Sequence, residues 1–159
     1  MNSSLLPFFQ WCESTPVGHA IKESLWLFPV IESVHLLGLA VLGGALLVVD
    51  LRMLGLGLRN QTIGTVARDA RPWLLASLGV MLLTGLALFL SESVKCYYSP
   101  AFWVKITTIP IAMIFTLTVR QRVAVAGIGQ ATLATRLTAL TSLALWFSVA
   151  AAGRWIGFS

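Results

Sequence analysis

Three side chains that can carry charge or bind a ligand share one side of an otherwise apolar stretch. At about 100° per residue, one helical stripe contains Glu32, His35, Leu39, Gly43, Leu46, Asp50 and Met53. Because lipid is a poor environment for ionisable groups, we expect this stripe to face other helices or a wet cavity. Gly43 would let a neighbouring helix or a flat ligand approach the backbone closely.

Two further stretches have polar faces that could line the same interior. One face carries Lys105, Thr108, Ala112 and Thr116, and the other carries Ser77, Met81, Thr84 and Leu88, leading towards Ser91 and Glu92. A buried carboxylate such as Glu32 needs a cationic partner, and Lys105 and Arg154 are at a similar depth. We therefore predict an outward-facing polar pocket formed by Glu32, His35, Lys105 and Arg154. The alternative is a structural ion pair that fixes helix register.

The two histidines have different expected roles. His35 either donates a hydrogen bond across helices or binds a metal or haem, since neutral imidazole is a common ligand of both. His19 follows Thr15 and Pro16, which are typical of a helix N-cap and first helical residue, and we expect it to be solvated. Met81 and Met113 fit packing positions better than ligand positions, and Asp50 with Arg52 is typical of an anchor at the inner membrane boundary.

The chain has two cysteines, Cys12 and Cys96. In an oxidising compartment thiols tend to pair. We predict a disulfide between them, which would close a long loop and contribute roughly 4 kcal/mol. The alternatives are two unpaired thiols, or a copper site completed by methionine or histidine.

These residues must be positioned by helices that cross a membrane. The 159 residues are 57% hydrophobic and only 11% charged, with a mean hydropathy of +0.86, whereas soluble domains are about 25% charged. A spanning helix needs about 20 apolar residues, and four stretches qualify, at residues 25–50, 72–91, 101–120 and 137–156. Residues 1–24 are apolar but too short to cross, so we expect an interfacial segment. The prediction is an all-α, single-domain, four-helix membrane bundle without a separate soluble domain.

The charged residues predict the orientation of the bundle. The first and third connections hold seven basic residues and two acidic ones, a net charge of +5, and these basic residues are Arg52, Arg59, Arg68, Arg71, Arg120, Arg122 and Arg136. The other side holds four basic and four acidic residues. The positive-inside rule places the first and third connections in the cytoplasm and both termini in the periplasm of a bacterial inner membrane. It also explains the net charge of +5 without nucleic-acid binding.

Several segments resemble an uncharacterised bacterial family of small four-span inner-membrane proteins. They are Trp11-Cys12 with Thr15-Pro16, Leu27-Phe28-Pro29 with Glu32 and His35, Asp50-Leu51-Arg52, Ser91-Glu92 with Lys95-Cys96-Tyr97, Pro100-Ala101-Phe102 with Lys105, and Gly153-Arg154-Trp155. More remotely, the chain resembles the copper-resistance D proteins and the J-type protoporphyrinogen oxidases. The latter resemblance implies haem b on a first-span histidine, here His35. No histidine lies in residues 106–120. The second ligand of the haem iron would therefore be Met81, Met113 or His19, or that coordination position would be open.

Three hypotheses follow. In the first, haem b is held by His35 with Glu32, Lys105 and Arg154 near it, and electrons pass between a quinone or periplasmic carrier and another partner. In the second, Glu32, His35 and Asp50 form a path for protons, copper or another cation. In the third, the chain is a non-catalytic membrane subunit of a homo- or hetero-oligomer. No phosphate-binding glycine loop, Cys-x-x-Cys or His-Glu-x-x-His motif points to hydrolysis or nucleotide chemistry.

Overall fold

Four long apolar helical stretches dominate the structure, a computed structural model that describes residues 4–58, 60–126 and 131–156. They are α3 (Leu27–Leu54), α4 (Ile63–Ser91), the continuous stretch Pro100–Ala126, and α8 (Leu133–Ile156). Each is long and apolar enough to cross a bilayer. The described residues contain helices and no strand. The predicted all-α four-span bundle is thereby confirmed.

The second long helix begins nine residues before the apolar stretch predicted for it. Thr62 caps α4 by accepting a hydrogen bond from the backbone N–H of Thr65. In the added turns the face formed by Ile63, Val66 and Ala67 is buried, while Arg68 and Asp69 remain exposed. This amphipathic pattern lets the helix extend beyond the lipid, so Pro72, the first residue of the predicted stretch, lies inside α4.

The third long stretch changes its winding near its middle. It comprises α6 (Pro100–Phe115), the π-helical turn η1 (Thr116–Arg120) and α7 (Gln121–Ala126), with Pro110 inside α6. A π-helical turn accommodates one more residue per hydrogen-bonded ring than an α-helix. It therefore changes the direction in which Arg120 points relative to the α6 residues before it.

The first long helix ends in a conventional glycine cap. Gly55 has a φ of 84°, in the left-handed region that favours glycine. The N–H of Leu56 bonds to the carbonyl of Leu51, and the N–H of Gly55 bonds to the carbonyl of Arg52. This Schellman arrangement pairs the last carbonyls of α3 and ends the helix sharply.

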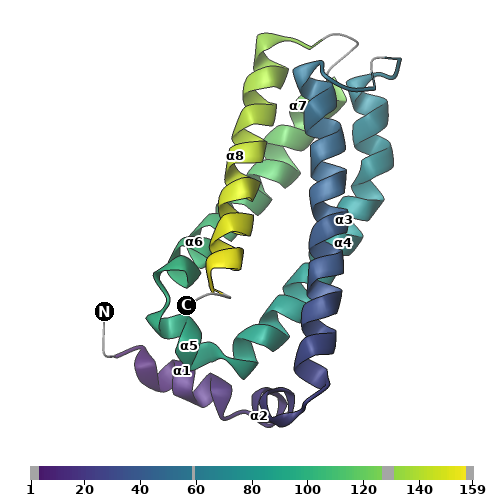
Figure 1. Cartoon of the computed structure of the whole chain (residues 1–159). Coiled ribbons are helices and arrows are strands. Elements are labelled where there is room, and N and C mark those ends of the chain that lie inside the picture. The colour runs from purple at the N-terminus through teal and green to yellow at the C-terminus, as the bar shows by residue number, and fades with distance from the viewer. Residues whose placement is uncertain (1–3, 59, 127–130, 157–159) are drawn as a thin grey trace.

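The four long helices pack as two pairs, α3 with α4 and α6 with α8 (Figure 1). The pairs meet most closely at the end of the bundle that carries α7, hereafter the α7 end. There the core consists of Val49, Met53, Ile63, Val66, Ala67, Ala124 and Ala139. A second apolar cluster, of Leu42, Leu46, Leu74 and Leu78, lies next along α3 and α4.

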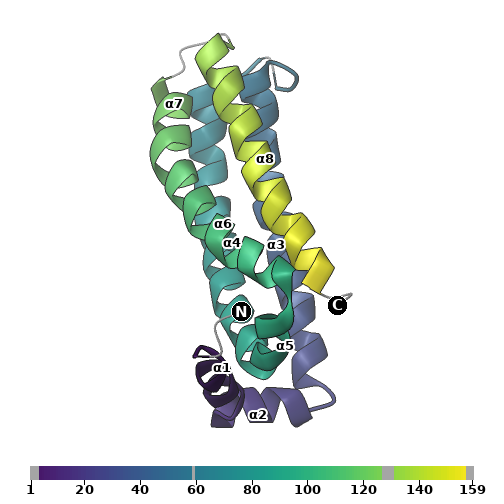
Figure 2. The same cartoon turned by 90° about the vertical axis from the view of Figure 1, so that its left-hand side faces the viewer.

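Two short helices, α1 (Leu6–Glu13) and α2 (Pro16–Glu23), lie across the opposite end of the bundle beside α5 (Ser93–Tyr98). Figure 1 and Figure 2 both show α1 and α2 steeply inclined to the long helices, and we call this the α1–α2 end. Gly18 allows α2 to approach α4 closely, because a Cβ at this position would lie 2.5 Å from the carbonyl oxygen of Leu90. Thr15 caps α2 and Pro16 is its first residue, as predicted.

Candidate functional site

The polar stripe of α3 becomes more accessible from the α7 end to the α1–α2 end. Asp50 is fully buried and Leu46 is 3% exposed, whereas His35 is half-buried and Glu32 is exposed. No other helix approaches Gly43 closely, since no atom outside its own helix backbone lies within 4 Å of the position its Cβ would take, and the approach of a flat ligand there stays a prediction. The residue that does allow close packing is Gly38, which lies against Val80 and Met81 of α4.

The polar face of α6 has the same gradient. Ala112, Thr116 and Arg120 are at most 3% exposed, while Lys105 and Thr108 are half-buried. Facing α3, Thr84 of α4 is half-buried as well. The interior faces of the long helices are therefore well packed towards the α7 end and partly open towards the α1–α2 end.

Glu32 does not form the ion pair predicted for it. Its carboxylate enters none of the ion pairs of the described residues, which join Glu13 to Lys22, His19 to Glu23, and Asp50 to Arg120. Glu32 lies in the second turn of α3 and is exposed. Near the end of a spanning helix a carboxylate can reach water or lipid headgroups, so it needs no buried cation.

His35 is held by a hydrogen bond between α3 and α4. Its Nδ1 lies 2.7 Å from the hydroxyl oxygen of Thr84. That hydroxyl also lies 2.6 Å from the carbonyl oxygen of Val80, to which it donates. The imidazole in addition packs over Gly85, where an added Cβ would lie 3.3 Å from Cε1 of the ring.

The hydrogen-bond network assigns the tautomer of His35. A hydroxyl has one proton, and the Val80 carbonyl can only accept. Because the Thr84 hydroxyl donates its one proton to the Val80 carbonyl, its oxygen can only accept a hydrogen bond from His35. Nδ1 of His35 therefore carries a proton. In the neutral imidazole, Nε2 then bears the free lone pair. This is the arrangement in which a histidine binds a metal through Nε2.

Lys105 lies near His35 on the facing helix pair. Its ammonium group packs against the backbone of Gly153, where an added Cβ would lie 3.4 Å from Nζ. It is close enough to act electrostatically on both His35 and Cys96. Lys105 makes no ion pair within the described part of the chain. Arg154, adjacent to Gly153, is exposed at the same end of α8.

Asp50 belongs to a buried network and is not simply an anchor at the membrane boundary. Its Oδ1 accepts from Nε of Arg120 at 2.7 Å, and its Oδ2 accepts from the hydroxyl of Ser142 at 2.7 Å. Arg120 also donates through Nη2 to the carbonyl of Leu46 at 3.0 Å. From the sequence Arg120 is expected only as a basic residue of the third connection, and no role is predicted for Ser142. One more turn of the Lys105 face, from Thr116, would have reached Arg120.

The two cysteines are free in the structure, so the predicted disulfide is absent. Both thiols are buried, Cys12 in α1 and Cys96 in α5. Burial raises the pKa of Cys12, and burial together with the charge of Glu92 raises the pKa of Cys96 to about 11. Thiols that stay protonated behave as small apolar side chains. Among the described residues no group of three or more potential ligands could hold a metal ion.

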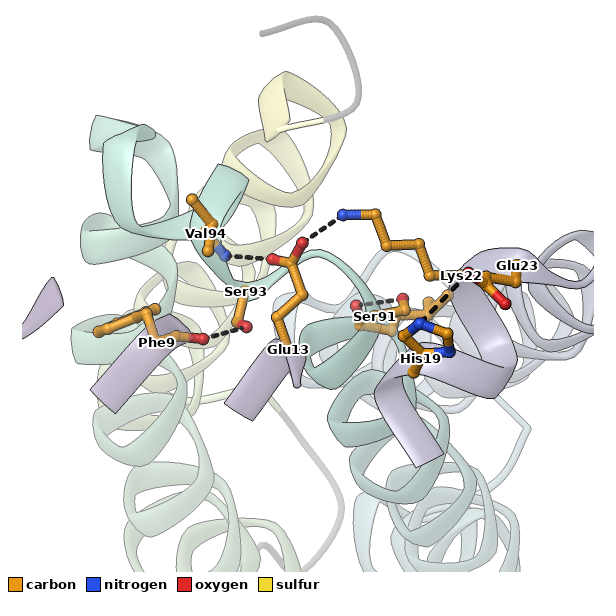
Figure 3. Close-up of polar contacts among 9 residues, drawn as sticks. Phe9, Glu13, His19, Lys22, Glu23, Ser91, Ser93 and Val94 are labelled. Carbon is orange, nitrogen blue, oxygen red and sulfur yellow. Dashed lines mark hydrogen bonds and ion pairs between the residues drawn. The ribbon is translucent and has the colours of Figure 1, made fainter. Parts of the chain in front are cut away.

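Polar contacts join α1 and α2 to α5 at the α1–α2 end (Figure 3). Glu13 accepts hydrogen bonds from the ammonium of Lys22 and, at 2.8 Å, from the backbone N–H of Val94. Ser93 donates to the carbonyl of Phe9 at 2.7 Å. The exposed His19 pairs with Glu23 as Figure 3 shows, which leaves it solvated, as predicted.

A shallow pocket of about 580 Å³ lies over these contacts, lined by Gln10, Glu13, Ser14, His19, Lys22, Glu23 and Val94. Burial alone would raise the pKa of Glu13, but the hydrogen bonds from Lys22 and Val94 and the charge of Lys22 outweigh it, so the pKa is lowered. The charged groups that line the pocket are thus largely paired with one another. The pocket belongs to the attachment of α1 and α2 and not to the His35 region.

A protein-family model described as a family of unknown function (DUF6644) matches residues 8–159, which is nearly the whole chain. No curated protein and no solved structure shows a significant match. The remoter resemblance to the copper-resistance D proteins and the J-type protoporphyrinogen oxidases stays a prediction.

Proposed function

We propose, for a chain that belongs to the DUF6644 family of unknown function, that its four membrane-spanning helices bind haem b and that it transfers electrons in the bacterial inner membrane. The family membership agrees with the resemblance to an uncharacterised family. That the chain is an integral membrane protein follows from its four apolar helices. The haem and the electron transfer are the proposal.

The observation that carries the proposal is the hydrogen bond from His35 to Thr84. It leaves Nε2 as the lone-pair nitrogen of His35, a half-buried residue of α3 whose ring contacts Thr84 and Gly85 of α4. A hydrogen bond on the other ring nitrogen is the usual companion of a metal-binding histidine, because it orients the ring and raises its basicity. Haem b, when bound, supplies a one-electron couple.

The charges near His35 suit a ligand that carries carboxylates. Lys105 offers three donors to an anion, and Arg154 lies at the same end. We propose that these two residues bind the haem propionates. Glu32 has the same charge as a propionate and would repel it, so its expected place beside the cofactor is not part of this proposal.

A single histidine ligand fits the described side chains best. His19, the other histidine, lies exposed on α2 and is paired with Glu23. Met113 and Met81 both pack against the apolar cluster that contains Leu42 and Leu46. Met81 lies on the same face of α4 as Thr84 and contacts the Gly38 region of α3. Met81 is therefore the methionine best placed to be a second ligand.

The proposed orientation places this site near the periplasm. Six of the seven basic residues of the first and third connections belong to the α7 end, and the seventh, Arg59, is outside the described residues. The positive-inside rule then places the α7 end in the cytoplasm. A quinone in the outer leaflet or a periplasmic electron carrier could reach the region of His35 from the opposite side.

The test is the absorption spectrum of the protein purified in detergent from cells supplied with a haem precursor. We expect a Soret band in the wild type, a loss of most of it in His35→Ala, and no loss in the matched control His19→Ala. A colourless wild type, or a Soret band retained by His35→Ala, would overturn the proposal. Colourless protein that is stabilised by added metal would favour the proton or cation path, and colourless protein without such stabilisation would favour the non-catalytic subunit.

The hypothesis of a proton or cation path is less well supported. It needs Asp50 as its inner member, but Asp50 is fully buried and bonded to Arg120 and Ser142. The apolar side chains of Leu42 and Leu46 lie between Asp50 and His35 along α3. A path through these residues would require the network to open.

A further inference from the structure

We infer that Thr84 is a positioning residue that holds His35 as the Nδ1–H tautomer and thereby selects the class of ligand that can bind its Nε2. That class comprises metal ions and hydrogen-bond donors, and it excludes groups that only accept hydrogen bonds. The inference about the tautomer stands on the hydrogen-bond network, whereas its application to haem rests on the proposed function.

The two hydrogen bonds of the Thr84 hydroxyl determine which of its partners donates and which accepts. Its hydroxyl donates to the carbonyl of Val80, four residues earlier on α4, a common bond for a helical threonine. The oxygen of the same hydroxyl lies 2.7 Å from Nδ1 of His35. The reverse assignment would leave the short Val80 contact between two acceptors. The helix backbone therefore fixes which way the bond to His35 runs.

Gly85 helps to position the imidazole ring of His35. Gly85, the residue after Thr84, lies directly under Cε1, with 3.3 Å between that atom and the position of an added Cβ. Thr84 thus restrains one edge of the ring while Gly85 leaves room for the edge beside it. Two adjacent residues of α4 set both the protonation pattern of the ring and its position.

The tautomer determines which ligands Nε2 of His35 can bind. Nε2 offers a lone pair, so it can bind a Lewis acid or accept from an O–H or N–H group. Lys105, on the other helix pair, can only donate. A quinone carbonyl, which only accepts, would be repelled at Nε2, whereas a quinol hydroxyl or a haem iron would be accepted there.

The tautomer can be measured without haem. In a preparation that lacks a Soret band, the nitrogen-15 NMR shifts of labelled histidine distinguish protonated from unprotonated ring nitrogens. The measurement is made in a His19→Gln background so that only His35 contributes. We expect a protonated Nδ1 with Thr84 or Thr84→Ser, and a shift towards the Nε2–H form, which free imidazole side chains prefer in water, with Thr84→Val.

The matched control is Thr107→Val, because Thr107 bonds only to carbonyls of its own helix. It should leave the His35 signals unchanged. An Nε2–H form in the unsubstituted His19→Gln protein, or an unchanged Nδ1–H form in Thr84→Val, would overturn the inference. Either result would leave the question of haem binding to the absorption spectrum.

In a preparation that does have a Soret band, the readout is the reduction potential of the haem. Loss of the Nδ1–H hydrogen bond makes the imidazole a weaker electron donor, so Thr84→Val should shift the potential to more positive values. Thr84→Ser should restore the wild-type potential, and Thr107→Val should not change it. Equal potentials in Thr84→Val and the wild type would overturn the inference while leaving haem binding intact.

Discussion

At the scale of single residues, the bundle contains two polar groups with opposite properties. Both carboxylate oxygens of Asp50 accept hydrogen bonds within the protein, from Arg120 and Ser142. His35 has one nitrogen bound to Thr84 and the other uncommitted. A buried ion pair with complete hydrogen bonding fixes helix positions, whereas a half-exposed imidazole with a free lone pair is suited to binding. This contrast is why the proposed function is built on His35 and not on Asp50.

The first residue-scale prediction concerns the buried ion pair. Asp50→Asn keeps a partner for Ser142 but removes the charge that faces Arg120, whose side chain is only 2% exposed. An unpaired buried charge costs about 3–5 kcal/mol. We expect a clear fall in the apparent unfolding temperature in detergent micelles.

The control for this substitution is Asp69→Asn, since Asp69 is an exposed carboxylate near the same end of the bundle. The double variant Asp50→Leu with Arg120→Met removes both charges and should recover most of the lost stability. An Asp50→Asn protein as stable as the wild type would show that Arg120 finds water or another partner.

At the scale of elements, α1 and α2 are attached to the bundle by a few specific contacts. Glu13 bonds to Val94 of α5, Ser93 bonds to Phe9 of α1, and Gly18 lets α2 lie against the end of α4. Phe8 and Trp11 on the outer side of α1 remain exposed. These exposed aromatic side chains are typical of a helix that lies at a membrane surface.

The element-scale prediction concerns the pH dependence of this attachment. The pKa of Glu13 is lowered in the folded protein from its ordinary value of 4.5. The stabilisation that ionised Glu13 gives to the attachment of α1 and α2 is therefore fully present when the pH is above that ordinary value. It is lost as the pH falls through the lowered pKa. We expect the protection of the Val94 amide against hydrogen exchange, corrected for its intrinsic rate, to decrease over that acidic range.

Glu13→Gln should show weak protection of Val94 at every pH, because it no longer carries the charge that binds Lys22. The matched control is Glu23→Gln, whose carboxylate is exposed and pairs only with His19. It should behave like the wild type. Protection of Val94 that does not change with pH in the wild type would contradict the role given to Glu13.

At the scale of the whole molecule, the two ends of the bundle differ in packing and in charge. The α7 end contains the main apolar core and the Asp50 network, and the connections there carry most of the basic residues. The α1–α2 end has half-buried interior faces that include His35 and Lys105. A bundle held firmly at one end and looser at the other can admit a ligand without losing its fold.

The whole-molecule prediction is the orientation in the membrane. Labelling of intact cells with a membrane-impermeant maleimide should modify Glu23→Cys but not Gln61→Cys, because the positive-inside rule places residue 61 in the cytoplasm. Both positions are exposed, whereas the native Cys12 and Cys96 are buried and give little background. The opposite labelling pattern would place His35 near the cytoplasm and exclude a periplasmic electron carrier.

The sequence alone determined the class of the fold. Long runs without charge can satisfy their backbone groups in lipid only as helices, so the four spans, the capped start of α2 and the polar stripe of α3 were all readable from local patterns. These features depend on residues close together in the chain. The same local reasoning identified His35 and Lys105 as candidates, since ionisable groups in an apolar stretch are conspicuous.

Only the tertiary structure decided which polar groups meet. The stripe on α3 does not reveal that Asp50 pairs with Arg120 across the bundle, because helical periodicity places each residue on an interior face but does not say which residues of two different helices lie at the same depth. Nor does it reveal that Glu32 is exposed, that Cys12 and Cys96 are free, or that Thr84 faces His35. The rotation and depth of each helix arise from packing between residues far apart in sequence, and side-chain pairing follows from them.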